Sequence, residues 1–371
     1  MIKILTVIGA RPQIIKAAAI SRAVREQFSD RIQEKILHTG QHYDTNMSQV
    51  FFDELGIPAP NYNLGVGSGS HGTQTAKMIE GIEKVLTEEH FDGIILYGDT
   101  NSTLAGAVAA AKLHVPVFHI EAGLRSFNMT MPEEQNRIVC DHLSSILFAP
   151  TQTALDNLNS EGLTGSKAVF AKGRSRRVIN SGDVMYDNAL YFSRLAEKKS
   201  TILEDCVVEP GKYILATVHR DFNTDNPDRI GNIFRALSDI AESDGVTVIL
   251  PLHPRTKKFL PDSLSKRIKI IPPASFFDIL VLEKNAKVVM TDSGGVQKEA
   301  FFFGRPCVIL RPETEWVEII QHNAGILADA DYHRIVDTYH TLSGCEVNFP
   351  PLFGDGNAAY IILQSILDYD N

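Results

Sequence analysis

The chain alternates between short apolar runs and longer amphipathic stretches along almost all of its 371 residues. Apolar runs of this length are typical of buried strands, and the stretches between them are typical of helices, so the alternation indicates βαβ units around parallel sheets. In the first half we predict strands at 2–8, 32–37, 93–97, 117–120 and 146–149, with helices at 12–26, 73–88, 102–112, 133–141 and 151–161.

The same pattern restarts in the second half of the chain, after a polar stretch at 162–183. There we predict strands at 213–218, 246–252, 287–290 and 307–310, and helices at 227–242, 276–283, 295–303 and 357–369. We interpret the basic cluster in the polar stretch as a solvated linker face, with phosphate binding as the lesser alternative; it comprises Lys167, Lys172, Arg174, Arg176 and Arg177.

We therefore expect two Rossmann-like α/β domains, the first spanning 1–175 together with 356–371 and the second spanning 176–355. Ligands of open parallel sheets bind at the carboxyl ends of the strands, so we expect the two sheets to face each other across a cleft.

Charge and cysteine content narrow the range of partners. The net charge of -9 argues against a general nucleic-acid surface. The four cysteines are scattered without CxxC pairing, which fits a reducing cytoplasm and no zinc site. The first residues read as a strand and not as a signal peptide, and no apolar run reaches the length of a membrane span. We therefore expect a cytoplasmic protein with no nucleic-acid or membrane partner.

A strand, a Gly-Gly turn and a helix start follow one another at Thr291-Asp-Ser-Gly-Gly-Val-Gln-Lys-Glu-Ala300. Free N–H groups at the start of a helix make an anion site. Glu299, on the first turns of that helix, is placed to reach sugar hydroxyls near a bound phosphate. This segment predicts a nucleotide or nucleotide-sugar ligand.

Two cations follow the first predicted strand, where Arg11 and Lys16 are expected to contact phosphate in preference to forming a surface pair. The turn lacks the GxGxxG fingerprint, which argues against a nicotinamide cofactor. After the second strand, His42 and Asp44 are ligand candidates, with an ordinary hydrogen-bonded loop an equal alternative.

Three carboxylates follow successive strand ends: Asp99, Glu121 and Glu133. Asp99 has two candidate roles, as a helix cap and as a carboxylate at the catalytic edge. Glu134 is the weaker candidate of its pair, because it also suits a dipole-matching surface position. Clustered carboxylates raise one another's pKa, as acid–base chemistry near neutral pH requires. We predict no metal, with Mg²⁺ as the open alternative.

In the second half, His219 and His253 each follow a strand. We interpret His219 as an electrostatic clamp or acid and His253 as a contact to base or ribose, with core packing as the alternative for His219. Trp316, the only tryptophan, either stacks on a base or packs beneath its loop.

The motifs GARPQ, TGQHYD, GDTNS, HIEAGLRS, MPEE, HPR, TDSGGVQKEA and RPETEW occur in one order from Lys3 to about Gly325. Together they resemble the non-hydrolysing UDP-N-acetylglucosamine 2-epimerase family. The resemblance implies two Rossmann-like domains in the GT-B arrangement and inversion of carbon 2 of a UDP-linked 2-acetamido sugar with no cofactor. A homodimer is also expected, because the family is commonly dimeric.

The resemblance also implies roles for individual residues. Asp99, Glu121 and Glu133 would move protons and His219 would assist UDP departure. The expected UDP-sugar contacts are Arg11, Lys16, Arg137, His253, Ser293, Gly294, Gly295 and Glu299.

Three departures from the family pattern leave the sugar open. Phe222 replaces a glutamate, Trp316 replaces a common arginine, and the segment 127–131 carries no basic residue. Trp316 and the RSFN…MPEE and NTD elements indicate a subgroup that acts on UDP-2,3-diacetamido-glucuronate or on 6-deoxy amino sugars, whereas the missing cations argue against a uronate. A hydrolysing epimerase, a GT-B glycosyltransferase and a non-catalytic nucleotide-sugar sensor are the alternatives in function.

Overall fold

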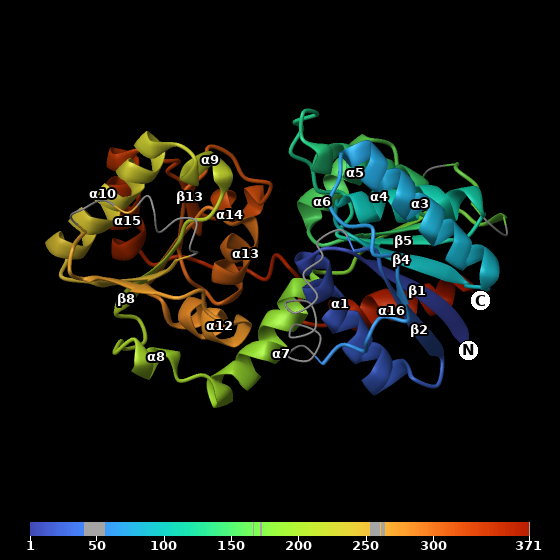
Figure 1. Cartoon of the computed structure of the whole chain (residues 1–371), viewed down its shortest axis with the longest axis horizontal. Helices are drawn as coiled ribbons and strands as arrows, with labels where there is room; N and C mark the ends of the chain where they lie inside the picture. The colour runs from blue at the N-terminus through green and yellow to red at the C-terminus, as the bar shows by residue number, and fades with distance from the viewer. Residues whose placement is uncertain (41–55, 166, 171–172, 253–259, 261–263, 371) are drawn as a thin grey trace. The chain divides into compact units, whose positions relative to one another are not determined.

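The computed structural model describes residues 1–40, 56–165, 167–170, 173–252, 260 and 264–370. Internal contacts divide the chain into two compact units, Met1–Asn188 with Pro351–Asn371 and Ala189–Pro350 (Figure 1). The sequence placed these boundaries at 175/176 and 355/356.

The first unit is built on a seven-stranded parallel sheet within the described residues, in the order β3-β2-β1-β4-β5-β6-β7. Its central strands are buried almost throughout, as expected of a parallel sheet covered on both faces. The strands are β1 (Ile2–Ile8), β2 (Ile32–His38), β3 (Tyr62–Asn63), β4 (Gly93–Tyr97), β5 (Val117–Ile120), β6 (Ile146–Ala149) and β7 (Arg177–Asn180).

Helices connect these strands, and the five predicted helices of the first half are present. They are α1 (Arg11–Ala23), α3 (His71–Glu88), α4 (Asn101–Lys112), α5 (Pro132–Leu143) and α6 (Gln152–Ser160). The first is shorter than predicted, because its final turn widens into a π-helical segment, η1 (Val24–Phe28). The C-terminal helix α16 (Ala358–Asp370) belongs to this unit.

The polar stretch at 162–183 contains the edge strand β7, which pairs with β6. An edge strand needs no continuous apolar run, so its sequence resembled a linker. Lys172 of the basic cluster lies outside the described residues, and Arg176 is half-buried. Its guanidinium lies 5.0 Å from the ring centroid of Phe170 and donates to the carbonyl oxygen of Ser144 at 3.1 Å.

The second unit contains a six-stranded parallel sheet within the described residues, in the order β10-β9-β8-β11-β12-β13. The strands are β8 (Tyr213–Thr217), β9 (Thr247–Pro251), β10 (Ile268–Ile271), β11 (Val288–Thr291), β12 (Cys307–Ile309) and β13 (Gly325–Leu327). The helices are α8 (Ile202–Asp205), α9 (Asp221–Thr224), α10 (Pro227–Ser243), α12 (Phe276–Asn285), α13 (Gly294–Phe302), α14 (Val317–Gln321) and α15 (Tyr332–Gly344), and α7 (Val184–Lys199) runs across the unit boundary.

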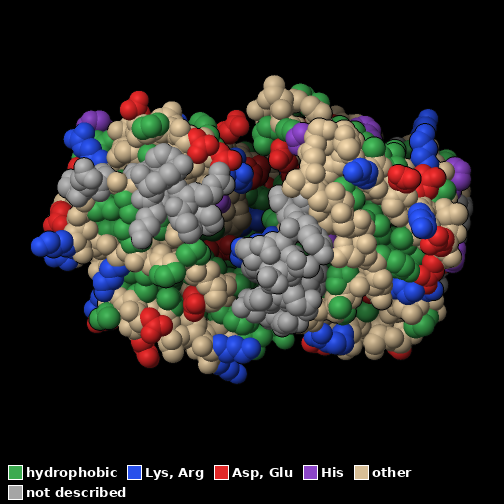
Figure 2. All heavy atoms as spheres, viewed as in Figure 1, with side chains coloured by type: hydrophobic (Ala, Val, Ile, Leu, Met, Phe, Trp, Pro, Cys, Tyr) green, Lys and Arg blue, Asp and Glu red, His purple; other side chains and the backbone are tan. Residues whose placement is uncertain are grey.

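Charged side chains of both signs are interspersed over the face of the molecule shown in Figure 2. Across the described ranges, we find no helix with the length and apolar character needed to cross a membrane.

Candidate active site

The turn between β1 and α1 is organised by the buried side chain of Gln13. Its carbonyl oxygen accepts from the N–H groups of Gly9 (2.8 Å) and Ala10 (3.2 Å). Its amide donates to the carbonyl oxygen of Tyr97 at 2.9 Å, which ties this turn to the carboxyl end of β4. The tie brings Arg11 and Lys16, on the first turns of α1, to the same sheet edge as the predicted carboxylates.

Glu121 lies directly after β5 and forms an ion pair with Lys16. Both side chains are largely buried. Gly98 makes room for the pair, because a Cβ atom there would lie 3.1 Å from the Glu121 carboxylate and 3.2 Å from the Lys16 ammonium group. Glu121 has a left-handed φ of 71°, which costs a non-glycine residue about 1–3 kcal/mol. Backbone strain of this kind is concentrated at functional sites.

Asp99, one residue after Gly98, forms an ion pair with Arg137 of α5. Burial raises the pKa of the Asp99 carboxyl, and the charges of Arg137 and Lys16 oppose this rise. The side chain keeps 32% exposure, so solvent moderates both effects. A carboxyl with a raised pKa that is open to solvent suits acid–base chemistry.

Glu134 differs from its expected position. It is buried, it pairs with Arg137, and its carboxylate accepts from the N–H groups of Ser126 (3.0 Å) and Phe127 (2.9 Å). The surface alternative for Glu134 was therefore wrong. Glu133 is the exposed member of the pair. Its catalytic role stays a prediction.

Two residues that the sequence analysis did not single out lie directly behind these carboxylates. His119 of β5 and Asp141 of α5 are fully buried, and Nδ1 of His119 lies 2.7 Å from Asp141. A histidine in an apolar strand usually signals core packing, so only the three-dimensional partner reveals the pair.

In the second unit, Asp292 organises the site. Its buried carboxylate accepts from the backbone N–H groups of His219 (3.1 Å) and Arg220 (3.0 Å) and from the side-chain amide of Asn223 (3.1 Å). The Nδ1 atom of His219 lies 3.2 Å from the same carboxylate, while 51% of the His219 side chain is exposed. Asp292 therefore joins the turn after β8 to the turn after β11 and leaves the imidazole accessible.

The helix α13 begins in the predicted anion-binding segment. Ser293 is its N-cap, and within the described residues the N–H groups of Gly294 and Gly295 donate no backbone hydrogen bond. Gly294 is packed too tightly for a side chain, since a Cβ atom would lie 2.4 Å from the Glu315 carboxylate. Gly295 is exposed, so its N–H group is open to a ligand. Glu299 lies one turn further along the same helix.

The structure also shows where Trp316 and Phe222 lie. Trp316 is 3% exposed and has the Lys298 ammonium 4.0 Å from its ring centroid, so it packs beneath the loop. Phe222 is 43% exposed on α9. His42, Asp44 and His253 lie outside the described residues.

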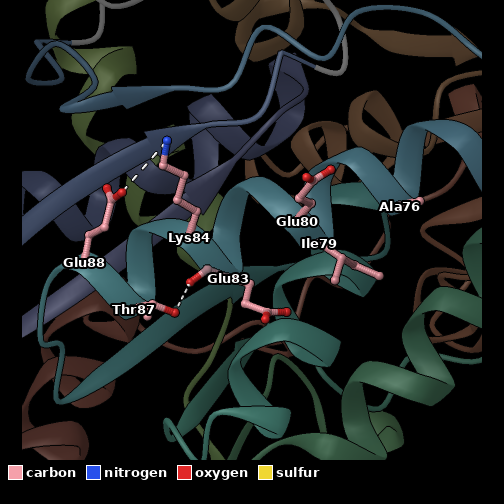
Figure 3. Close-up of a pocket in the computed structure, with 7 residues that line it drawn as sticks. All are labelled: Ala76, Ile79, Glu80, Glu83, Lys84, Thr87 and Glu88. Atoms are coloured by element: carbon pink, nitrogen blue, oxygen red, sulfur yellow. Dashed lines mark hydrogen bonds and ion pairs between the residues drawn. The ribbon is translucent and has the colours of Figure 1, made fainter.

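A shallow hollow lies elsewhere, along the exposed face of α3 (Figure 3). Its lining includes three glutamates, Glu80, Glu83 and Glu88, which disfavour an anionic ligand, and none of the predicted site residues. The described part of the chain contains no group of three or more His, Cys, Asp or Glu side chains that could hold a metal ion.

Sequence comparison with known proteins identifies the family of this chain. The sequence profile of the UDP-N-acetylglucosamine 2-epimerase family matches residues 25–367. The chain belongs to this family. A UDP-2,3-diacetamido-2,3-dideoxy-D-glucuronate 2-epimerase of Pseudomonas aeruginosa is 46% identical over 98% of both chains.

Two solved structures of relatives superpose over nearly their whole length. The UDP-GlcNAc 2-epimerase of Methanocaldococcus jannaschii in complex with UDP-GlcNAc and UDP is 40% identical, with a TM-score of 0.84 and 99% of each chain covered. The Neisseria meningitidis enzyme bound to UDP-GlcNAc is 28% identical, also with a TM-score of 0.84, over 99% of this chain and 100% of that one. The predicted family and isomerase activity are confirmed, and so is the fold class of two parallel-sheet α/β domains.

Proposed function

We propose that this protein inverts carbon 2 of a UDP-linked 2-acetamido sugar, with UDP-N-acetylglucosamine as the first candidate, and that it does so without hydrolysis. The observation that carries the proposal is a polar site at the carboxyl edge of the sheet in each unit. Asp99 and Glu121, which we propose as proton-transfer groups, lie in ion pairs at the edge of the first sheet, and an open helix start follows β11 in the second. Relatives crystallised with UDP-GlcNAc support the choice of ligand.

The proposed mechanism is elimination and re-addition. A carboxylate removes the proton from carbon 2 while the bond between the anomeric carbon and the UDP oxygen breaks, which leaves a 2-acetamidoglucal and UDP. UDP then re-forms the bond as a proton reaches the opposite face of carbon 2. Asp99, Glu121 and Glu133 are the proposed proton-transfer groups.

The larger demand in this mechanism is the charge that develops on the departing diphosphate, because the amide makes carbon 2 only weakly acidic. The open N–H groups at the start of α13 and the exposed imidazole of His219 supply positive potential for that charge. We assign Ser293, Gly294 and Gly295 to the phosphates and Glu299 to the ribose, with Arg11, Lys16, Arg137 and His253 as further UDP-sugar contacts.

A second candidate substrate is UDP-2,3-diacetamido-2,3-dideoxy-D-glucuronate, favoured by the 46% identity to the Pseudomonas aeruginosa enzyme. The segment 127–131 argues for a neutral sugar instead, because it offers no cation for the carboxylate of a uronate.

A panel of UDP-sugars with product analysis by NMR tests the proposal. We expect UDP-N-acetylglucosamine to give UDP-N-acetylmannosamine. Inversion of only the uronate or a 6-deoxy sugar would select that substrate. Accumulating free N-acetylmannosamine, transfer to an added acceptor, or tight UDP binding with no turnover across the panel would each overturn it in favour of a hydrolase, a glycosyltransferase or a sensor. We further propose that the protein is a cytoplasmic homodimer and that it serves polysaccharide biosynthesis. Light scattering on the purified protein tests whether it is a dimer.

A further inference from the structure

The buried pair formed by His119 and Asp141 lies between the two loops that carry Asp99 and Glu121. The imidazole of His119 projects from β5, and the carboxylate of Asp141 projects from α5. Neither side chain is exposed, so neither is available to a substrate. Their contacts nevertheless reach both loops.

On one side, the pair holds the loop after β4. The Nε2 atom of His119 donates to the carbonyl oxygen of Gly98 at 2.8 Å, and the N–H group of Gly98 donates to the carbonyl oxygen of Ile120 at 3.0 Å. Gly98 is the residue immediately before Asp99. The peptide groups on both sides of Gly98 are therefore held by hydrogen bonds.

On the other side, the pair holds the loop after β5. Asp141 accepts from the N–H group of Gly123 at 3.1 Å and from the Arg125 guanidinium at 2.8 Å. Gly123 follows Glu121 by two residues, so this contact braces the segment in which Glu121 adopts its left-handed conformation. Arg125 is itself bound by both oxygens of Glu161, at 2.6 and 2.7 Å.

The protonation of the pair follows from its partners. Both ring nitrogens of His119 face oxygen atoms, and the carbonyl oxygen of Gly98 can only accept. Asp141 accepts from two other donors, the Gly123 N–H group and the Arg125 guanidinium, so the proton between the two side chains belongs to the imidazole and His119 carries a positive charge. Burial alone would lower the pKa of His119, but the neighbouring Cys140 and Asp141 raise it well above its ordinary value.

We propose that His119 and Asp141 are positioning residues, a single buried ion pair that fixes the loop bearing Asp99 to the loop bearing Glu121. The inference rests on the proposed function for its catalytic consequence. Its structural content, one pair that holds two loops, does not depend on the substrate. The positions of reacting groups must be held to well under an ångström, so a pair that fixes both loops should affect kcat.

The test compares Asp141→Asn and His119→Gln with Asp92→Asn as a control. Asp92 lies immediately before the other end of β4 and accepts from the backbone N–H group of Lys3 at 2.7 Å, so this control removes a hydrogen-bonded, partly exposed carboxylate remote from the loops. We expect both test variants to lose kcat by about 10–100-fold while KM and the Kd for UDP stay within about threefold. The control should keep the kcat of the parent.

Hydrogen exchange supplies a readout that does not need turnover. In either test variant, peptides that cover 97–103 and 120–127 should both exchange faster than in the parent, while the rest of the sheet keeps its protection. Unchanged protection in these loops, loosening spread evenly over the unit, or a parental kcat in folded Asp141→Asn would overturn the proposal. If the parent turns over none of the UDP-sugars, the proposed function fails, and the exchange data still decide whether the pair holds both loops.

Discussion

Replacing Asp292 by asparagine should destabilise the second unit and weaken its hold on UDP. The carboxylate is fully buried and accepts three hydrogen bonds, from the backbone N–H groups of His219 and Arg220 and from the amide of Asn223. Asparagine has the same shape but only one acceptor oxygen and no charge. Its amide group must therefore face at least one donor.

The expected magnitude follows from these bonds. A hydrogen bond to a charged group contributes about 1.5–3 kcal/mol and a neutral one about 1 kcal/mol. The three donors share Oδ2, which the asparagine oxygen can replace, so the three bonds become neutral and each weakens by about 1 kcal/mol. The free energy of unfolding of this unit should therefore fall by about 3 kcal/mol. For a unit of this size the change corresponds to a fall in Tm of roughly 6–12 °C.

The single tryptophan makes the assay specific to this unit. Trp316 is 3% exposed within the second unit, so urea unfolding followed by its fluorescence reports on that unit. Asp329→Asn is the matched control, because Asp329 is partly exposed in an ion pair with Arg229, and we expect it to cost less than about 1 kcal/mol. A midpoint for Asp292→Asn equal to that of the control would refute the reasoning.

Three further predictions concern other parts of the molecule. Asp99→Asn or Glu121→Gln should abolish turnover and leave the UDP affinity measured by calorimetry intact, whereas Glu299→Ala should weaken UDP binding; the reverse pattern would overturn the division of labour between the units. Gly9→Ala should cost about 1–3 kcal/mol in thermal unfolding, since its Cβ would lie 2.1 and 2.2 Å from two buried hydroxyl oxygens. Glu283 is fully buried with no partner for either oxygen within the described residues, and burial beside Glu299 raises its pKa well above 4.5. The parent should therefore lose stability as the pH rises from about 4.5 towards the raised value, by up to about 1.4 kcal/mol per pH unit, and Glu283→Gln should remove this slope in urea titrations at several pH values.

The central strands were predictable because both faces of a parallel sheet are buried, so each of these strands has a continuous apolar sequence. The short strands β3, β7, β10 and β13 lie at or near sheet edges and were not predicted. Their burial is partial, and β7 even reads as polar. Whether such a segment pairs as an edge strand depends on its neighbour in the sheet, and that neighbour is not identified by the local sequence.

Within the site, the sequence placed Asp99 and Glu121 correctly at strand ends, because polar residues that interrupt an apolar run mark the carboxyl edge of the sheet. The choice between Glu133 and Glu134 depends on where the loop before α5 folds. That loop brings the N–H groups of Ser126 and Phe127 onto Glu134, a contact without a local signature. The role of His119 depends on a partner 22 residues away in the chain.

Solvent deuterium is the most direct test of the proposed elimination and re-addition. The parent enzyme would convert UDP-N-acetylglucosamine in D₂O, and proton NMR would follow carbon 2 of the product. The account predicts that the epimer forms with deuterium from solvent at carbon 2 and with UDP still attached. An epimer that keeps its original proton at carbon 2 would contradict the account.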